Sequence, residues 1–229
     1  MEQNENYIDM IINSLKYAIS DGGALLWGGV AALGSMLLIG LPFLFGYITQ
    51  CGRSVLQGSD KLPAWDNLGG KFTDGIMILI VGLVFALISG LLYVLVMPFI
   101  VVGAIIESEL LLFAGILMLL PAIAISAIVS LLMPAAWVEY AVTGDLIRAI
   151  NPICALRLAA RNPIAYIGAV IATMIVNALL SIPAALVVTV PWTTFIGYAS
   201  AAYVYAWFYR QTNLAVPVTG MSGPAVAAV

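Results

Sequence analysis

Long stretches without a charged side chain are the feature that most limits how this chain can fold. There are four of them, bounded by Asp21 and Arg53, Asp74 and Glu107, Glu109 and Glu139, and Arg161 and Arg210. Of the 229 residues, 63% are hydrophobic and 8% are charged, far from the balance of a water-soluble domain. A helix needs about 20 apolar residues to cross a hydrocarbon core about 30 Å thick. The sequence therefore predicts an all-α integral membrane protein.

The lengths of these stretches predict a helical bundle with about five transmembrane helices. Each of the first three stretches fits one crossing, whereas the fourth holds 48 uncharged residues and fits two. The expected spans cover about 24–48, 75–106, 110–138, 164–182 and 192–209. Two prolines, Pro183 and Pro191, mark the connection between the last two spans. Two alternatives stay open for residues 183–191, a turn between spans or a re-entrant segment.

The positive charges predict which side of the plasma membrane each end occupies. With five spans, Lys16 lies alone on one side and the other seven Lys and Arg side chains lie opposite. Positive side chains favour the cytoplasmic side. We therefore expect the N-terminus outside and the C-terminus in the cytoplasm. Cys51 and Cys154 would then face the reducing cytoplasm as free thiols.

Two segments outside the spans have the pattern of surface helices. Residues 7–19 place isoleucine and leucine on one face and polar residues on the other, which predicts an amphipathic helix lying in the membrane interface. Residues 143–161 are similar and carry three arginines, which either bind lipid headgroups or a partner or simply anchor the segment. The expected interfacial anchors are Trp65, Trp137, Trp192, Trp207, Arg148, Arg157, Arg161 and Arg210.

The connection between the first two spans has the most distinctive sequence of the chain. It contains Leu62-Pro63-x-Trp65-Asp66 and then Phe72-x-Asp74-Gly75, and the later stretch 151–157 reads Asn-Pro-Ile-Cys-Ala-Leu-Arg. Over about residues 7–210 this pattern resembles the prokaryotic multi-span membrane family catalogued as domain of unknown function 4013. The resemblance implies a helical bundle with interfacial helices, and it implies no activity, because none is assigned to that family.

Ordinary structural roles account for this motif. Pro63 ends a helix, Trp65 anchors the loop at the headgroups, Asp66 caps a following turn, and Asp74 and Gly75 cap the second span. The alternative is a cytoplasmic binding platform that uses Trp65, Asp66 and Asp74. We favour the structural interpretation, because anchoring and capping explain every residue of the motif.

Rows of small side chains within the spans predict where helices pack together. Such side chains let two helix backbones approach closely, and polar members of a row form interhelical hydrogen bonds. The rows are Gly82, Ala86 and Gly90; Ala122, Ser126 and Ser130; and Ala165, Ala169, Thr173, Asn177 and Ser181. Helix packing is the simpler interpretation, and a polar path or a small ligand site around Asn177 is the alternative.

The composition leaves few groups for catalysis, so we expect a protein that is not an enzyme and that has no cofactor or metal site. Histidine is absent and cysteine occurs twice. A net charge of −3 disfavours nucleic acid as a partner. We expect residues 1–210 to form a single transmembrane domain and residues 211–229 to form a tail that is disordered or ordered by a partner.

These observations predict a non-catalytic membrane protein. The first hypothesis is an accessory or assembly subunit of a larger membrane complex, with the lipid bilayer and other membrane subunits, or a second copy, as partners. The alternative is a transporter or channel for a small or lipidic solute.

Overall fold

The computed structural model describes residues 6–212, and in this part of the chain every regular element is helical. The elements are α1 (Tyr7–Ala18), α2 (Gly22–Ser35), α3 (Leu41–Leu56), α4 (Leu68–Ile105), α5 (Glu109–Thr143), α6 (Leu146–Ile150), α7 (Pro152–Arg161), α8 (Pro163–Ala184), the short 3₁₀ turn η1 (Val187–Thr189) and α9 (Val190–Gln211). The all-α prediction is confirmed. The expected tail, residues 211–229, lies almost wholly outside the described residues.

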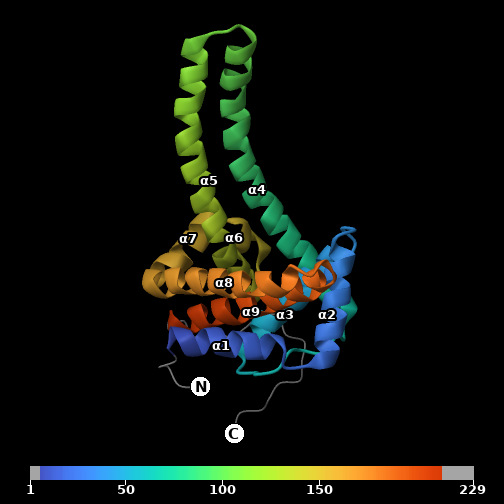
Figure 1. The fold of residues 1–229 in the computed structure, drawn as a ribbon. Helices are drawn as coiled ribbons and strands as arrows, with labels where there is room; N and C mark the ends of the chain where they lie inside the picture. The colour runs from blue at the N-terminus through green and yellow to red at the C-terminus, as the bar shows by residue number, and fades with distance from the viewer. Residues whose placement is uncertain (1–5, 213–229) are drawn as a thin grey trace.

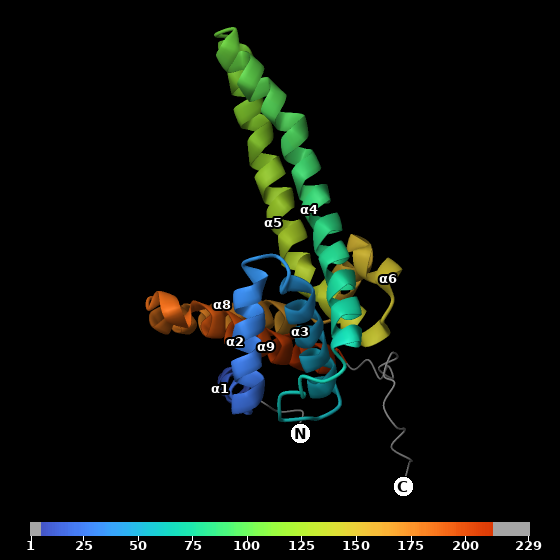
Figure 2. The same ribbon diagram turned by 90° about the vertical axis from the view of Figure 1, so that its right-hand side faces the viewer.

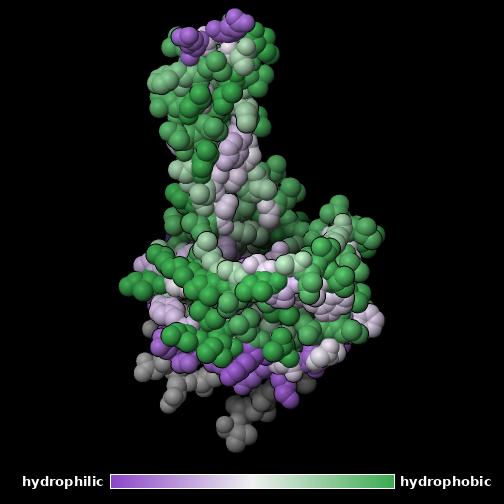
Figure 3. All heavy atoms as spheres, in the orientation of Figure 1, coloured by the Kyte–Doolittle hydropathy of each residue, from purple (hydrophilic) through white to green (hydrophobic). Residues whose placement is uncertain are grey.

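The molecule has two parts, which we call the tower and the base. The tower is the long antiparallel hairpin of α4 and α5, and the base contains all the other helices (Figure 1). Helices α1, α8 and α9 run crosswise to the tower, as two perpendicular views show (Figures 1 and 2). The tower is apolar along most of its length and polar at its tip (Figure 3).

Helix α9 forms the core of the base. It packs against α1, α2, α3 and α8, and most of its side chains from Pro191 to Tyr209 are buried. The rings of Phe195 and Phe208 are fully enclosed. On the α1 side, Ser200 Oγ donates a hydrogen bond to the Ser14 carbonyl over 3.2 Å. Helix α1 is therefore fixed to the base along one face, while its other face exposes Ile8 and Ile12, as an amphipathic helix should.

The predicted first span, residues 24–48, is wrong, because the segment forms two helices instead of one. Helix α2 ends at Ser35 and α3 begins at Leu41 after a sharp turn in which Leu38 has a left-handed φ of 64°. The chain folds back so closely that a Cβ on Gly40 would lie 2.5 Å from the Ala31 carbonyl oxygen. The segment is apolar throughout, but glycine at position 40 lets it reverse direction halfway.

The predicted fifth span, residues 192–209, also needs correction. Three helices of the described chain are long and apolar enough to cross a membrane, and they are α4, α5 and α8. Helix α9 is not among them, since its threonine, serine and tyrosine side chains lower its mean hydropathy. It also lies buried in protein. Between α8 and α9, the chain turns at residues 185–189.

The boundaries of the second and third predicted spans also differ from the structure. Helix α4 starts at Leu68, before the expected start at 75, and α5 continues to Thr143, past the expected end at 138. Both extensions carry polar side chains; the α5 extension is buried in the base from Glu139 to Val142, whereas in the α4 extension Lys71 is buried and most of the other residues are exposed.

A very close crossing of α3 and α4 joins the tower to the base. A Cβ on Gly46 of α3 would lie 1.6 Å from the Lys71 carbonyl oxygen, and a Cβ on Gly75 of α4 would lie 1.6 Å from the Pro42 carbonyl oxygen. The two glycines thus allow the backbones of the two helices to touch at two points, one turn apart along α4. No other residue type fits at either position.

Replacing either glycine by alanine should prevent this crossing. We expect Gly46→Ala to lower the free energy of unfolding by more than about 3 kcal/mol, since the added methyl group overlaps backbone atoms that cannot rotate away. Gly90→Ala is the matched control, because nothing lies within 4 Å of its Cβ position. Thermal unfolding in detergent measures both, and a Gly46→Ala variant as stable as Gly90→Ala would contradict the crossing.

Candidate functional site

An ionic network lies where α3 meets the lower ends of α4 and α5. The Arg53 guanidinium donates from Nη1 to Asp74 Oδ2 over 2.5 Å and from Nη2 to Asp74 Oδ1 over 3.3 Å. Its Nε donates to the Ala141 carbonyl over 2.9 Å, and the Tyr140 hydroxyl donates to Asp74 Oδ1 over 2.9 Å. The Arg53 side chain is 8% exposed. Every polar group of the network has a partner within the chain, so its arrangement is structural.

The position of Asp74 corrects the sequence interpretation. We expected Asp74 and Gly75 to cap the second span, but the N-cap of α4 is Asn67, whose side-chain oxygen accepts from the Gly70 amide over 3.2 Å. Asp74 lies inside α4 and pairs with Arg53. The sequence carried one signal of this pair, an arginine and an aspartate at the ends of adjacent apolar segments, but spacing alone does not show which charges meet.

The motif around Trp65 forms a second cluster, on the side of α3 that faces the connecting loop. The rings of Trp65 and Tyr47 stack in parallel, with their centroids 4.2 Å apart. The Tyr47 hydroxyl donates to the Pro63 carbonyl over 2.8 Å, and the Trp65 indole N–H donates to the Ala24 carbonyl over 3.0 Å. The loop is therefore held against α2 and α3 by the tryptophan that we expected to anchor it to headgroups.

Lys71 completes this cluster and is 2% exposed. Its ammonium group donates to the Asp66 backbone carbonyl and lies 3.1 Å from the Asp66 carboxylate. It also lies 5.9 Å from the centre of the Tyr47 ring. Asp66 therefore binds a buried cation and does not cap a turn, so the predicted capping role is wrong. The hydrogen bonds of Tyr47, Trp65 and Lys71 are made within the chain, whereas the Asp66 side chain is 72% exposed, so the alternative of a cytoplasmic binding platform stays a prediction.

The Arg53 and Asp74 pair should behave as a coupled unit. We expect Arg53→Met alone to lower the free energy of unfolding by about 3–5 kcal/mol, because it leaves a partly buried carboxylate without its cation. The double variant Arg53→Met, Asp74→Leu should lose less than the sum of the two single variants, by roughly 0.5–3 kcal/mol. Chemical unfolding of the four proteins measures this coupling, and strictly additive losses would show that the pair does not interact.

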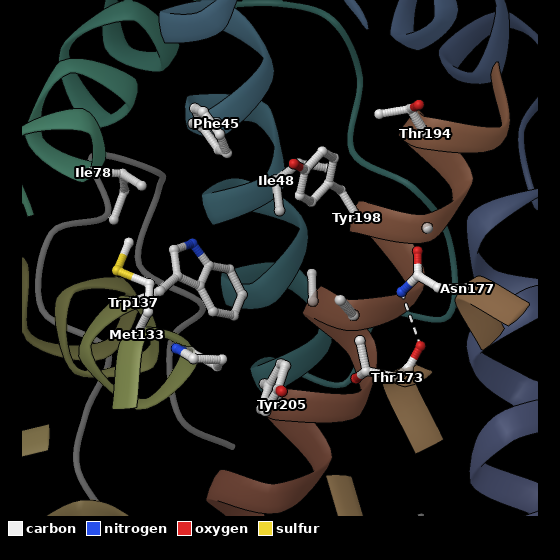
Figure 4. Close-up of a pocket in the computed structure, with 14 residues that line it drawn as sticks. Phe45, Ile48, Ile78, Met133, Trp137, Thr173, Asn177, Thr194, Tyr198 and Tyr205 are labelled. Carbon is white, nitrogen blue, oxygen red and sulfur yellow. Dashed lines mark hydrogen bonds between the residues drawn. The ribbon is translucent and has the colours of Figure 1, made fainter. Parts of the chain in front are cut away.

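A cavity of about 400 Å³ lies between the lower end of the tower and α8 and α9. Its wall is mainly carbon and includes Phe45, Ile48, Ile78, Met133, Pro134, Trp137, Ala201 and Ala202. A few polar groups reach the same space from α8 and α9, namely Thr173, Asn177, Thr194, Tyr198 and Tyr205 (Figure 4). This volume is within the usual range of small-molecule sites, about 300–1,000 Å³.

Asn177 is the most polar side chain of this cavity, and its hydrogen bonding is local. Its amide nitrogen donates to the Thr173 carbonyl of the same helix over 2.8 Å (Figure 4). Its amide oxygen faces α9, where a Cβ on Gly197 would lie 2.9 Å away. The cavity explains why Asn177 stands out in the sequence, and an oxygen directed toward α9 is available to a ligand.

The predicted small-residue rows lie on different kinds of surface. In the third span, Ala122 and Ser126 are buried whereas Ser130 is exposed; in α8, Ala165 and Ala169 are buried whereas Asn177 and Ser181 are exposed and Thr173 is half-buried. In the row Gly82, Ala86 and Gly90, a Cβ on Gly82 would have only the end of Met133 of α5 within 4 Å, and a Cβ on Gly90 would have nothing. The close contacts of the tower are at Gly103 and Gly115 near its tip, which the sequence analysis missed because each glycine stands alone and belongs to no row.

The predicted interfacial anchors lie mostly within protein contacts. Trp137 and Trp207 are buried, and Trp192 covers Gly29 of α2. The Trp137 indole N–H donates to Thr49 Oγ1 over 3.1 Å. Among the arginines, Arg148 forms an ion pair of 2.8 Å with Glu139, Arg157 and Arg161 are exposed, and Arg210 is half-buried with an interaction inside the chain. Trp27, which is 58% exposed, was not among the expected anchors.

Both cysteines are free thiols, as predicted, but their surroundings differ. Burial raises the pKa of the Cys51 thiol from its ordinary 9.0 to about 12. Burial also raises the pKa of the neighbouring Tyr17 and Tyr47 hydroxyls. Cys154 is only half-buried.

In the folded protein Cys51 should therefore resist alkylation up to pH 10, while Cys154 reacts. The thiolate is the reactive form, and the fold keeps the Cys51 thiol protonated below about pH 12. In the unfolded chain the same thiol ionises near its ordinary pKa of 9.0, so the folded state loses stability as the pH rises above 9. Mass spectrometry of a Cys154→Ser variant treated with maleimide, folded and unfolded, tests this. Equal labelling of both forms would contradict it.

A comparison with known families places the chain. A profile of the family described as a protein of unknown function (DUF4013) matches residues 30–189, which is more than half of the chain. The chain belongs to the DUF4013 family. The matched range of this DUF4013 protein includes the motif around Trp65, both helices of the tower and the α8 wall of the cavity. Searches of curated proteins and of solved structures found no match.

Proposed function

We propose that this DUF4013 protein is a non-catalytic membrane subunit that assembles with another membrane helix through the outer face of α4. The observation that supports this is the open row of Gly82, Ala86 and Gly90. No heavy atom of another element lies within 4 Å of a Cβ built on Gly90, and only the end of Met133 is near Gly82, at 3.6 Å. Ala86 is exposed.

This row differs from the part of α4 that contacts α5. The residues that face α5 and the base include Ile78, Val81 and Phe85, all of which are buried. The small side chains begin one residue further along, which is about 100° around the helix. Exposed leucines at 83, 87 and 91 flank them. Small residues four apart let a second helix approach closely, and lipid chains gain nothing from them.

Adding volume to this row should separate assembly from folding. We expect Gly90→Ile to keep the thermal stability of the isolated subunit but to lose the partner during purification in mild detergent. Gly103→Ile is the contrasting variant, because a Cβ at 103 would lie 2.8 Å from the Leu112 nitrogen, so the tower itself should be destabilised.

The readout is the stoichiometry of co-purified membrane protein together with the unfolding temperature. Co-purification of the Gly90→Ile variant with an unchanged stoichiometry would show that this face of α4 meets lipid. A monomer with no partner in the parent protein would contradict the proposal as a whole.

A second candidate function, binding or transport of a lipidic solute, is favoured by the cavity of Figure 4. An apolar wall with a single amide and a few hydroxyls suits a molecule with a long apolar part and one polar group. Tyr198 and Asn177 border the cavity and are exposed, so a ligand has access from outside.

Filling this cavity should abolish such binding. Ala201 lines the space, and Ala201→Phe should weaken binding of a fluorescent fatty acid at least about tenfold, since the ring occupies the site. Ala178→Phe is the matched control, because Ala178 is exposed on α8 and does not line the cavity. Energy transfer from tryptophan to the fatty acid measures binding, and equal affinities of the two variants would show that the cavity is not the site.

A further inference from the structure

The charges of the chain divide between the two ends of the tower. All eight Lys and Arg side chains belong to the base or to the lowest turn of α4: Lys16, Arg53, Lys61, Lys71, Arg148, Arg157, Arg161 and Arg210. The turn at the tip of the tower contains Glu107 and Glu109 and no positive side chain. Figure 3 shows hydrophilic residues at the tip and on the underside of the base, with apolar surface between them.

The segment before α2 and the loop after α3 lie side by side in the base. The Tyr17 hydroxyl donates to the Cys51 carbonyl over 3.2 Å, and the Leu62 amide donates to Ser20 Oγ over 3.0 Å. These bonds join residues that the five-span prediction places on opposite sides of a membrane. The start of α2 and the end of α3 therefore lie on the same side of the membrane.

The turn between α2 and α3 has the apolar, exposed surface of a segment that inserts into lipid. Its four successive apolar residues, 36–39, are 63–76% exposed. This turn points in the direction in which the tower rises (Figures 1 and 2). The turn after α8 is similarly apolar, with Val187 and Val188 about 80% exposed, but it lies along the base. Both hairpins keep their backbone hydrogen bonds within helices, which allows them to enter hydrocarbon without crossing it.

The free part of the tower has the length of one crossing. On α4, the last residue buried against the base is Phe85, and the helix continues to Ile105. Residues 86–105 are 20 residues and extend about 30 Å at 1.5 Å each, which equals the thickness of the hydrocarbon core. A bilayer that covers this part places the tip on one side and the base at the other interface.

From these observations we infer that α4 and α5 are the only helices of the described chain that cross the membrane. The base lies at the cytoplasmic interface, the hairpin of α2 and α3 enters the cytoplasmic leaflet and returns, α8 and α9 lie along the base, and Asn6 and Thr212, the two ends of the described chain, share the cytoplasmic side. This arrangement places all eight positive side chains inside, whereas five spans leave one outside.

Single-cysteine labelling of the full chain in intact cells tests this topology. In a background with Cys51→Ala and Cys154→Ser, one cysteine is introduced at a time as Asn6→Cys, Asp60→Cys, Glu109→Cys or Val188→Cys. We expect a membrane-impermeant maleimide to label only Glu109→Cys in intact cells, and to label Asn6→Cys and Asp60→Cys as well once the membrane is permeabilised.

Each unexpected labelling pattern would contradict a different part of the inferred topology. External labelling of Asn6→Cys without Asp60→Cys would restore a crossing between α1 and the loop and overturn the inference. External labelling of Val188→Cys would show that α8 and α9 both cross, and would overturn it too. Labelling of Asn6→Cys and Asp60→Cys from outside, with Glu109→Cys protected, would reverse the orientation and contradict the cytoplasmic base. Folding of each variant is checked by its elution as a single species in detergent.

Discussion

The contact between Gly46 and Gly75 is the constraint on which the rest of the structure depends, because it sets how the tower meets the base. Two helices whose backbones touch at two points cannot slide or rotate relative to each other without overlap. Arg53 of α3 also connects the base to both helices of the tower, since its guanidinium binds Asp74 of α4 and the Ala141 carbonyl of α5. The tower therefore leaves the base as a rigid unit, and the cavity beside it keeps its shape because three of its walls, α3, α4 and α5, are joined by the same side chain.

Burial of α9 explains the rest of the base. A helix with many tyrosines and hydroxyl groups would be a poor transmembrane segment, but as the centre of a protein core it can satisfy hydroxyl groups within the protein, as Thr193 does by donating to the Val190 carbonyl over 3.0 Å and Ser200 does by donating to the Ser14 carbonyl over 3.2 Å. Its small positions, Gly197 and Ala199 among them, admit α8 and α3 closely. In their most apolar stretches, α4 and α5 have fewer buried residues (17% and 22%) than α8 (28%).

The sequence predicted the class of structure better than its topology. Charge-free length was enough to predict an all-α membrane protein, and the isoleucine spacing of residues 7–19 was enough to predict a helix with one apolar face. An apolar composition indicates that lipid or protein surrounds a segment, but it does not indicate the direction of the backbone. The reversal at Gly40 was therefore not predicted. Some interactions that build the site, such as the hydrogen bond from the Trp65 indole to the Ala24 carbonyl, join residues on either side of that reversal and depend on it.

Small residues in a membrane helix can be interpreted only when the structure shows what lies next to them. Gly103 and Gly115 are isolated in the sequence, yet each meets the opposite helix of the tower within 3 Å of a Cβ position. Gly82 and Gly90 form a regular row, yet little or nothing lies near them. In water an exposed apolar face would be decisive evidence for a partner, but lipid covers leucine and isoleucine without penalty, so exposure alone carries no such weight here. What lipid does not explain is a row of glycine and alanine beside the exposed leucines at 83, 87 and 91, because flexible lipid chains gain nothing from small side chains. This row on α4 is therefore better matched by a second helix than by the bilayer.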